Sequence, residues 1–247
     1  MRKNFYLNRY FTTVKKQLNQ NIYTPKTENQ KKYFEYLNKD NNYIISVMGP
    51  AGTGKTLMAC LTAINHLKEK KIKKIIITRP VISVEEEIGF LPGNIEKKMD
   101  PWTKPIFDIF SEYYSKPDIT NMISKGIIEI SPLGFMRGRT FKYSFIIADE
   151  MQNSSKNQML MLLTRIGLSS KMVITGDLEQ SDKSNDNGLK DFINRIEERK
   201  DTNNIYLIKM DKNDVQRSDL VNEVLSLYNK QNKVKNIYKN YIDFENL

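Results

Sequence analysis

An eight-residue loop constrains the fold more than any other part of this chain. The loop reads Gly49-Pro50-Ala51-Gly52-Thr53-Gly54-Lys55-Thr56 and fits the pattern G-x-x-x-x-G-K-[ST] at every fixed position. An apolar run, residues 43–48, precedes it, and the apolar residues after Lys55 recur at helical spacing, so a strand-to-helix turn is expected here. Such a turn directs backbone N–H groups and the positive end of a helix dipole at a polyphosphate. The pattern therefore predicts a nucleotide-binding loop.

Three residue types in this loop have separate chemical roles in the predicted site. Glycine lets the backbone approach phosphate closely because it carries no Cβ. Lys55 supplies positive charge for the β- and γ-phosphate oxygens, and the Thr56 hydroxyl can ligate Mg²⁺. ATP and Mg²⁺ are therefore the expected cofactors.

Six apolar, β-branched runs recur along the chain, with helix-like stretches between most of them. They are residues 43–48, 75–78, 127–130, 145–148, 172–175 and 205–209. Such alternation predicts an α/β fold with a mainly parallel sheet and helices on both faces. Ligands of such folds gather beyond the carboxyl ends of the strands, so the residues after each run are candidates for the site.

Carboxylate and amide side chains lie at positions that suit ATP hydrolysis. Asp149, directly after the fourth run, is placed to hold Mg²⁺, and Glu150 beside it can orient or deprotonate the attacking water. Gln180, after the fifth run, is expected to sense the γ-phosphate, with a surface glutamine as the alternative. Gln30, ahead of the first run, could bind an adenine edge through its amide, and a surface position is again the alternative.

Two expectations concern local structure. His66, late in the helix predicted after the loop, is expected on the helix surface, since no second His or Cys pair accompanies it to hold a metal. The stretch at about 81–125 is expected to be a helical insertion with turns at its prolines and glycines.

Composition sets broad limits on the kind of protein. The chain has 247 residues, of which 39% are hydrophobic, and one large α/β domain is the expected arrangement. No apolar stretch approaches the ~20 residues that span a bilayer, and the N-terminus shows no apolar core of a secretory signal. Cys60 is the only cysteine, which excludes an internal disulfide. We therefore expect a cytoplasmic protein with no membrane segment.

The chain is basic, with 39 Lys and Arg against 29 Asp and Glu and a net charge of +10. Residues 1–40 carry nine basic and three acidic side chains. This surplus favours a polyanionic partner such as nucleic acid, and solubility alone is the alternative.

Seven segments together closely resemble the PhoH family of P-loop ATPases. They are GPAGTGKT (49–56), ITRPVISVEEEIGFLPGNIEKKMDPW (77–102), SPLGFMRGRTF (131–141), FIIADEMQN (145–153), LLTRIG (162–167), VITGDLEQSD (173–182) and DVQRSDLV (214–221). The resemblance covers about residues 25–228 and leaves a basic N-terminal arm, 1–24, and a polar C-terminal tail, 229–247, outside it. It implies ATP binding and hydrolysis on a RecA-like core, similar to the first motor domain of superfamily 1 helicases.

Two positions depart from the usual wording of the family. Met151 stands where Ala is usual after the Asp-Glu pair, which should alter packing rather than chemistry. Ser218 stands where His is common, so the resemblance assigns no role to that position.

The resemblance also implies a homo-oligomer. Related helicase motors complete the ATP site with arginines from a second RecA-like domain, and this chain has residues for only one. We therefore expect a ring, for example a hexamer, in which Arg165 or Arg217 reaches an adjacent ATP. Internal salt bridges are the alternative for each arginine.

Three arginines on loops after strands are candidates for contact with nucleic acid: Arg79, Arg137 and Arg139. Contact with the nucleotide, or support of the fold, is the alternative. The expected function is a Mg²⁺-dependent ATPase coupled to RNA or single-stranded DNA. The main alternative is a nucleotide-dependent assembly or signalling module that moves no strand, whereas the Asp149-Glu150 pair disfavours a small-molecule kinase.

Overall fold

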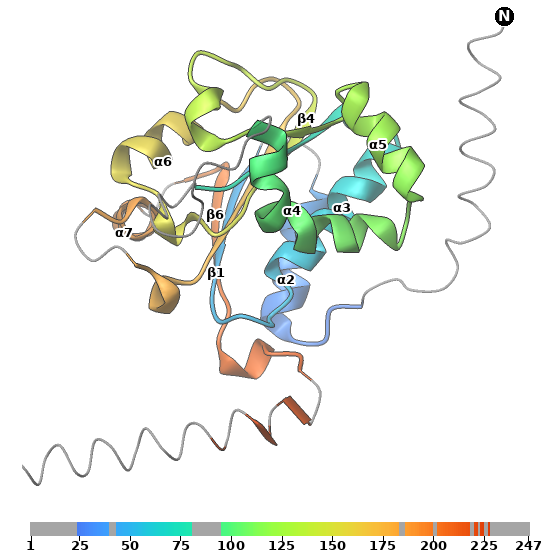
Figure 1. Cartoon of the computed structure of the whole chain (residues 1–247). Helices are drawn as coiled ribbons and strands as arrows, with labels where there is room; N and C mark the ends of the chain where they lie inside the picture. The colour runs from blue at the N-terminus through green and yellow to red at the C-terminus, as the bar shows by residue number, and fades with distance from the viewer. Residues whose placement is uncertain are drawn as a thin grey trace, which may run out of the picture. The chain divides into compact units, whose positions relative to one another are not determined.

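Six strands form one parallel sheet in the computed structural model of this chain (Figure 1). The structure describes residues 24–39, 43–80, 95–182, 186–199 and 202–217, and positions 220, 221, 223, 224 and 227. The strands are β1 (Ile44–Met48), β2 (Lys74–Thr78), β3 (Ile128–Ile130), β4 (Ser144–Ala148), β5 (Lys171–Gly176) and β6 (Ile205–Lys209). All six predicted runs are confirmed as strands, with each bound correct to within one residue.

The strand order determines which loops meet at the site. Across the sheet the order is β3-β2-β4-β5-β1-β6, and every neighbouring pair is parallel. The carboxyl ends of all strands therefore lie at one edge. Strand β5 separates β1, which leads into the glycine loop, from β4, which leads into Asp149. Loops from three adjacent strands thus converge at one place.

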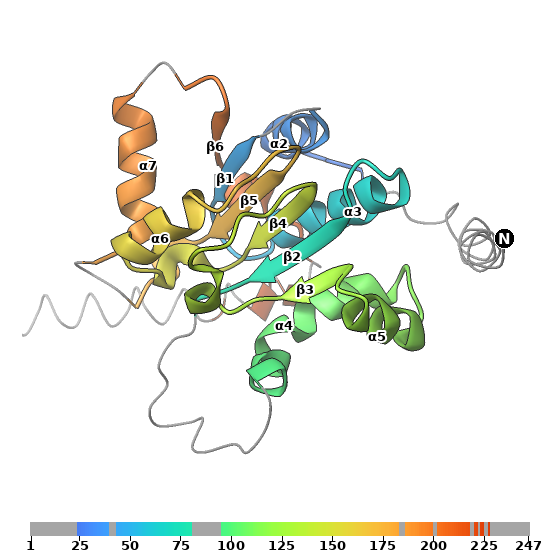
Figure 2. The same cartoon turned by 90° about the horizontal axis from the view of Figure 1, so that it is seen from above.

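Helices cover both faces of the sheet, as the α/β prediction requires (Figure 2). One face packs against α2 (Glu28–Asn38), α3 (Lys55–Lys68), α4 (Ile95–Ser111) and α5 (Lys116–Ser124), and the other against α6 (Lys156–Leu163) and α7 (Gly188–Glu198). Within the described residues, four short 3₁₀ helices follow strands or lie between elements: η1 (Leu133–Met136), η2 (Met151–Asn153), η3 (Leu178–Gln180) and η4 (Lys212–Asp214).

Alternation along the strands explains why their sequences are continuously apolar. Ile75 and Ile77 pack toward α3, whereas Ile76 between them packs toward the opposite layer. Strand β4 repeats this division, with Phe145 on one face and Ile146 on the other. Because successive side chains point to opposite faces, a strand covered on both sides is apolar at most of its positions. The core therefore consists of two layers, one on each face of the sheet.

Two local expectations are wrong. His66 is buried, with 5% of its surface exposed, and its ring meets that of Phe145 edge-on at 5.8 Å between centroids. The reason is that α3 lies on the sheet with α2 and α4 beside it, so even its last turn is covered. Helix α4 continues past Pro101 and Pro105, where turns were expected. Its Ile106 and Phe110 are buried in the core, and this packing outweighs the preference of proline for a turn.

The contacts divide the chain into two units, residues 1–214 and 215–247. The first unit holds the sheet and all the loops described below. Arg217 belongs to the second unit. Residues 1–23 of the basic arm, 81–94 of the insertion, Ser218 and the tail 229–247 lie outside the described residues, so the expected domain boundaries stay predictions. No helix in the described part of the chain is long and apolar enough to cross a membrane.

Candidate functional site

The glycine loop joins β1 to α3 in a conformation that only glycine adopts readily. Gly49, Gly52 and Gly54 have φ of 144°, 86° and 83°, values that L residues with a Cβ rarely adopt. A Cβ on Gly49 would lie 2.4 Å from the carbonyl oxygen of Met210. Gly54 is the N-cap of α3 and gives the first turn no side-chain hydrogen bond, so the donors there are left to a ligand or to solvent. The backbone thus has the form of an anion-binding turn.

Lys55 lies within the arc of this loop. Its Nζ donates to the carbonyl oxygens of Gly49, at 2.6 Å, and Pro50, at 2.8 Å. Burial lowers the pKa of Lys55 from its ordinary value, although the nearby carboxylates of Asp177, Glu150 and Asp149 act in the opposite direction. The charged form of Lys55 is therefore held in place but incompletely stabilised.

Thr53 stabilises the loop from inside, whereas Ala51 and Gly52 are exposed at its tip. The Thr53 side chain is fully buried, and its Oγ1 donates to the Pro50 carbonyl at 2.9 Å. This bond closes the turn across three residues, so the loop has a defined shape of its own.

Thr56 and Asp149 meet at the start of α3. The Thr56 hydroxyl donates to Oδ1 of Asp149 at 2.7 Å, and the hydroxyl of Thr175 on β5 donates to the same oxygen at 2.6 Å. Asp149 is 7% exposed. A hydroxyl and a carboxylate are the hard oxygen ligands that Mg²⁺ takes together with phosphate and water. The donor set of Thr56 and Asp149 therefore fits the ion that the sequence analysis predicted.

Glu150 follows in a strained conformation. Its φ of 54° and ψ of 42° are left-handed, which costs a residue with a side chain about 1–2 kcal/mol. Its backbone N–H donates to Thr175 Oγ1 at 3.4 Å, and its Oε2 accepts from Nε2 of Gln152 at 2.5 Å. Strain of this kind, over-determined by neighbours, is common where a side chain must be held for function.

Gln152 is the residue that the sequence analysis missed. It is 2% exposed, and while its Nε2 holds Glu150, its Oε1 accepts from the backbone N–H of Asp177 at 3.2 Å. One amide thus joins the loop after β4 to the loop after β5. Its place two residues beyond the acidic pair was the available signal, because a polar residue so close to a buried strand end needs partners.

The hydrogen bonds continue from Gln152 to the start of α7. The Gln152 carbonyl accepts from Ser181 Oγ at 3.0 Å, and Ser181 Oγ accepts from Asn187 Nδ2 at 2.8 Å. Asn187 is the N-cap of α7, where its Oδ1 accepts from the backbone N–H of Lys190 at 2.9 Å. The acidic couple, Asp149 and Glu150, is therefore connected to α7, which lies on the face of the sheet opposite α3.

Gln180 lies in η3, close to the end of β5. Its Nε2 donates to Oδ2 of Asp177 at 2.7 Å, and the other oxygen of Asp177 accepts from the backbone N–H of Glu179 at 3.0 Å. Gln180 is exposed whereas Asp177 is buried. The structure therefore holds Gln180 at the expected strand exit, and its role as a sensor of the γ-phosphate stays a prediction.

Gln30 is fully buried, which rules out the alternative of a surface position. Its Nε2 donates to the carbonyls of Thr53, at 3.2 Å, and Asp214, at 3.0 Å, while its Oε1 accepts from the backbone N–H of Lys26 at 2.9 Å. The side chain also completes the capping box of α2 with Thr27. Contact with an adenine edge, still a prediction, would require some of these bonds to be exchanged.

Arg165 has partners within its own chain. Its Nε donates to the Met161 carbonyl at 3.0 Å, its Nη1 to the Arg139 carbonyl at 3.1 Å and its Nη2 to Thr164 Oγ1 at 2.9 Å. The internal partners are thus carbonyl and hydroxyl oxygens and not the carboxylates of the expected salt bridge. To reach a neighbouring ATP, this guanidinium would have to leave all three.

The three loop arginines differ in how they are held. Arg139 pairs with Oε1 of Glu129 at 2.5 Å and lies over the ring of Phe141 at 4.6 Å. Arg79 follows β2 and is half-buried, and Arg137 follows η1 and is exposed. Neither has a hydrogen-bond or ion-pair partner among the residues that the structure describes. Arg139 therefore has a structural contact, and Arg79 and Arg137 are the more available of the three.

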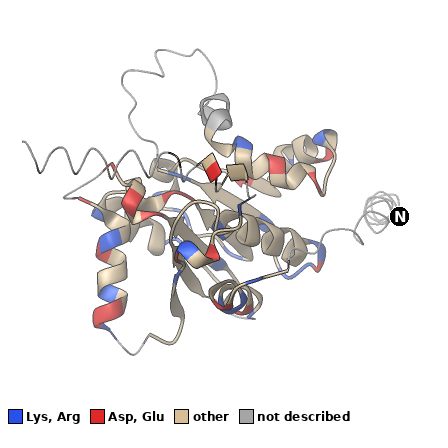
Figure 3. Ribbon diagram, turned by 90° about the horizontal axis from the view of Figure 1, so that it is seen from below, with Lys and Arg blue, Asp and Glu red and all other residues tan. Residues whose placement is uncertain are grey.

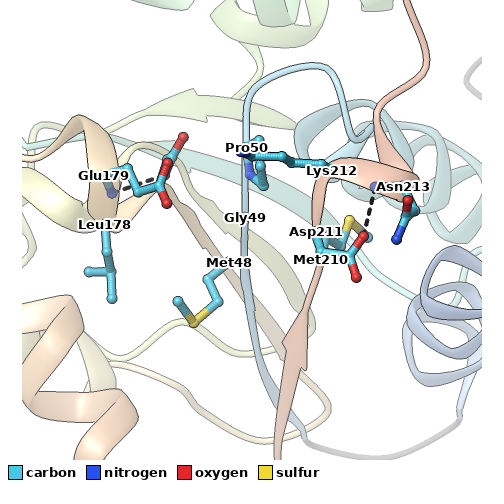
Figure 4. Close-up of a pocket in the computed structure, with 10 residues that line it drawn as sticks. Met48, Gly49, Pro50, Leu178, Glu179, Met210, Asp211, Lys212 and Asn213 are labelled. Atoms are coloured by element: carbon cyan, nitrogen blue, oxygen red, sulfur yellow. Dashed lines mark hydrogen bonds between the residues drawn. The ribbon is translucent and has the colours of Figure 1, made fainter. Parts of the chain in front are cut away.

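A pocket of about 470 Å³ borders the first residues of the loop (Figure 4). It lies between the carboxyl ends of β1, β5 and β6, and Figure 4 shows Glu179 on one side and Lys212 on the other. Met48 and Met210 contribute apolar surface to its lining. The pocket adjoins Gly49 and Pro50 but not Lys55 or Thr56, so it lies beside the predicted phosphate site.

Sequence comparison identifies relatives over nearly all of the described part. Residues 22–229 match the family described as "PhoH-like protein". The chain is 41% identical over 208 residues to a PhoH-like protein of Bacillus subtilis, covering 84% of this chain and 64% of that one. It is 40% identical over 206 residues to one of Mycobacterium tuberculosis, covering 83% and 57%. With protein PhoH of Escherichia coli it shares 35% over 199 residues, covering 76% and 54%. The chain thus spans between about half and two thirds of these relatives' length.

Solved structures give only distant likenesses. A helicase domain of Hef from Pyrococcus furiosus superposes with a TM-score of 0.45 at 12% identity, covering 75% of this chain and 38% of that one. The Pif1 helicase of Candida albicans gives a TM-score of 0.35 at 16% identity, covering 75% and 40%. Scores this low carry no functional conclusion, so the fold assignment rests on the sheet and loop geometry.

Proposed function

This chain belongs to the PhoH family, and from that premise we propose that it binds ATP and hydrolyses it in a Mg²⁺-dependent reaction. The fold is that of a P-loop ATPase-like protein. One observation carries the proposal: Thr56, at the end of the glycine loop, donates at 2.7 Å to Asp149, the first residue beyond a buried strand. The glycine loop and the acidic couple thus meet at the same place on the carboxyl edge of the sheet.

The residues of this edge divide the work of hydrolysis between them. Backbone N–H groups of the loop and Nζ of Lys55 bind the phosphates, and Lys55 exchanges its bonds to Gly49 and Pro50 for bonds to phosphate oxygens. Thr56 and Asp149 would hold Mg²⁺, which would neutralise charge on the phosphates when bound. Glu150 accepts a hydrogen bond from the attacking water and takes its proton, while Gln152 keeps the Glu150 carboxylate in position.

Turnover by purified protein tests this proposal directly. Wild type should release phosphate from ATP only when Mg²⁺ is supplied. Glu150→Gln should retain ATP without hydrolysing it, because the amide keeps the size of the side chain but cannot take a proton. Lys55→Ala should lose binding itself. Wild-type protein that neither retains ATP nor releases phosphate would overturn the proposal.

We further propose that hydrolysis is coupled to RNA or single-stranded DNA. The family resemblance supports this, as do Arg79 and Arg137, which leave the same edge of the sheet as the ATP loop. Single-stranded RNA or DNA should raise the turnover rate, and binding should weaken steeply with salt if phosphate contacts dominate. Turnover indifferent to both polymers would instead support the nucleotide-dependent assembly module.

The third part of the proposal is a homo-oligomer with a shared ATP site. Arg165 donates to three oxygens of its own chain, so Arg165→Ala would disturb the fold as well as any shared site, and the test begins with Arg217. If Arg217 completes a neighbouring site, Arg217→Ala should spare ATP binding and lower turnover by about 10³-fold. Sedimentation in the presence of ATP and single-stranded RNA should show a ring, and a monomer under those conditions would refute it.

A further inference from the structure

Charge alone does not locate a nucleic-acid path on this molecule. In the view of Figure 3, Lys and Arg are interspersed with Asp and Glu over the described helices and loops. A site for a polyanion must therefore be identified from local geometry. The segment that stands out is η1 and the residues after it, where an exposed aromatic ring lies next to an exposed arginine.

Phe135 is exposed although the helix that carries it is firmly held. It leaves 61% of its surface exposed, compared with 38% for Phe34 and for Tyr143. On either side of it in η1, Leu133 is 1% and Met136 0% exposed, and both pack in the core layer against α6. Two buried anchors in a four-residue turn thus fix the turn and force Phe135 outward.

Backbone hydrogen bonds and an ion pair fix the segment on both sides. The N–H of Phe135 donates to the Pro132 carbonyl at 2.9 Å, and that of Arg139 donates to the Met136 carbonyl at 3.2 Å. The Arg139 guanidinium is tied to Glu129 at 2.5 Å. A rigid segment does not lose much freedom when a ligand binds, which favours recognition.

The surroundings of Phe135 leave room for a flat ligand. A Cβ placed on Gly134 or on Gly138 would meet no atom within 4 Å, so both glycines border open space. Arg137, two residues from Phe135, is exposed and has no hydrogen-bond or ion-pair partner in the described part of the chain. The segment thus offers an aromatic face, an available guanidinium and no bulky side chain at either glycine.

The position of the segment relates it to the ATP site. It begins directly after β3, and the N–H of Ser131 at its start donates to the Ile77 carbonyl of β2 at 2.9 Å. Strand β2 in turn leads into Arg79. The loops after β2 and β3 thus leave the same edge of the sheet as the glycine loop and the acidic couple.

We propose that Phe135 is a stacking platform for an unpaired nucleobase of single-stranded RNA or DNA, with Arg137 binding an adjacent phosphate. Stacking on an exposed aromatic ring does not depend on base identity, because every base has a flat π-face. This inference rests on the proposed coupling to nucleic acid and adds to it a side chain that touches the base. It predicts binding without strong sequence preference.

Binding of single-stranded oligonucleotides that contain 2-aminopurine tests the platform, since the fluorescence of this base is quenched on stacking. Wild type should quench it, and Phe135→Trp should preserve quenching. Phe135→Leu should abolish it and weaken binding about 10-fold or more, because leucine keeps apolar bulk but lacks a π-face. Leu160→Ala is the matched control, since Leu160 is 64% exposed and apolar but lies on α6; it should change neither signal.

Salt dependence separates the two side chains. Arg137→Ala should reduce the slope of log affinity against log salt by about one, whereas Phe135→Leu should weaken binding equally at every salt concentration. If Phe135→Leu binds the oligonucleotide with the affinity of the wild type, this inference alone is overturned. A wild-type chain that binds neither polymer would overturn the inference together with the proposed coupling. A change in oligomer mass in Phe135→Leu, with unchanged binding, would assign Phe135 to a protein contact and also overturn it.

Discussion

The Thr56 hydroxyl lies 2.7 Å from Oδ1 of Asp149, so two residues 93 positions apart in the sequence meet at one point. The same carboxylate oxygen accepts from the hydroxyl of Thr175 on β5, the strand that lies between β1 and β4. Asp149 therefore bonds to the loop of β1 and to β5 while itself following β4. This convergence makes Asp149 the residue whose charge can be tested with the least disturbance of structure.

Asp149→Asn should remove metal-dependent turnover and leave the fold intact. The amide oxygen of asparagine can still accept from Thr56 and Thr175, so the melting temperature should change little. Loss of the negative charge weakens the hold on Mg²⁺, and we expect turnover to fall on the order of 10³-fold. Malachite-green phosphate release across a Mg²⁺ titration measures this, and full activity at ordinary Mg²⁺ concentrations would contradict it.

Gln152→Ala should lower kcat for ATP more than it raises KM. Without the amide, Glu150 loses a partner at 2.5 Å, and misplacement of a reacting group by about 1 Å costs up to 10²-fold. Gln152→Glu should be equally impaired because it places a second carboxylate against Glu150. Gln158→Ala is the control, since Gln158 caps α6 through Ser155 and should affect stability alone. Equal kcat in Gln152→Ala and Gln158→Ala would contradict the positioning role.

As pH rises, ATP affinity should begin to fall at a lower pH than it would if Lys55 had the pKa of an ordinary lysine. Burial lowers the pKa of Lys55 below its ordinary value of 10.5, and a bound triphosphate favours the charged form and so raises that pKa. ATP binding therefore takes up a proton in the interval between the two pKa values, and affinity is lost as pH rises through the lower one. Titration calorimetry from about pH 8 to about pH 10.5 should show this. In Lys55→Arg, which stays charged, the affinity should be flat across that interval, and a flat wild-type curve would refute the prediction.

Gly49→Ala should destabilise the protein strongly. The added Cβ would lie 2.4 Å from the Met210 carbonyl oxygen, at a residue whose φ of 144° a side chain tolerates poorly. We expect a loss of at least about 2 kcal/mol, which corresponds to a fall in melting temperature of roughly 4–8 °C. Gly134→Ala is the control, because no atom lies within 4 Å of its added Cβ. Equal melting temperatures of the two variants would contradict the argument.

The sequence sufficed to predict the sheet because its strands are buried on both faces. In β4, Phe145 packs on one face and Ile146 on the other, and no polar residue interrupts the run from Phe145 to Ala148. The glycine loop and Asp149 were located for the same reason, since each directly follows such a run. Features attached to a strand end are thus visible in local sequence.

Contacts between distant segments were not predictable in this way. The Gln30 amide donates to the carbonyl of Asp214, 184 positions away, and nothing near Gln30 in the sequence indicates that partner. In the sequence, Arg165 and Arg139 look like loop arginines that are available to a ligand. Only the structure shows that Arg165 donates to the carbonyl of Arg139. The burial of His66 was not predictable because the neighbours that cover α3, helices α2 and α4, come from separate parts of the chain.

Asn187 meets two demands with one side chain. Its Oδ1 begins α7 by accepting from Lys190, while its Nδ2 completes the series of bonds that starts at Glu150. Aspartate would cap the helix but could not donate to Ser181, and alanine could do neither. Position 187 should therefore tolerate far less variation than a helix cap normally does, although Asn187 lies on the opposite face of the sheet from Lys55. Substitution of Asn187 should therefore lower the turnover rate more than it lowers the stability of α7.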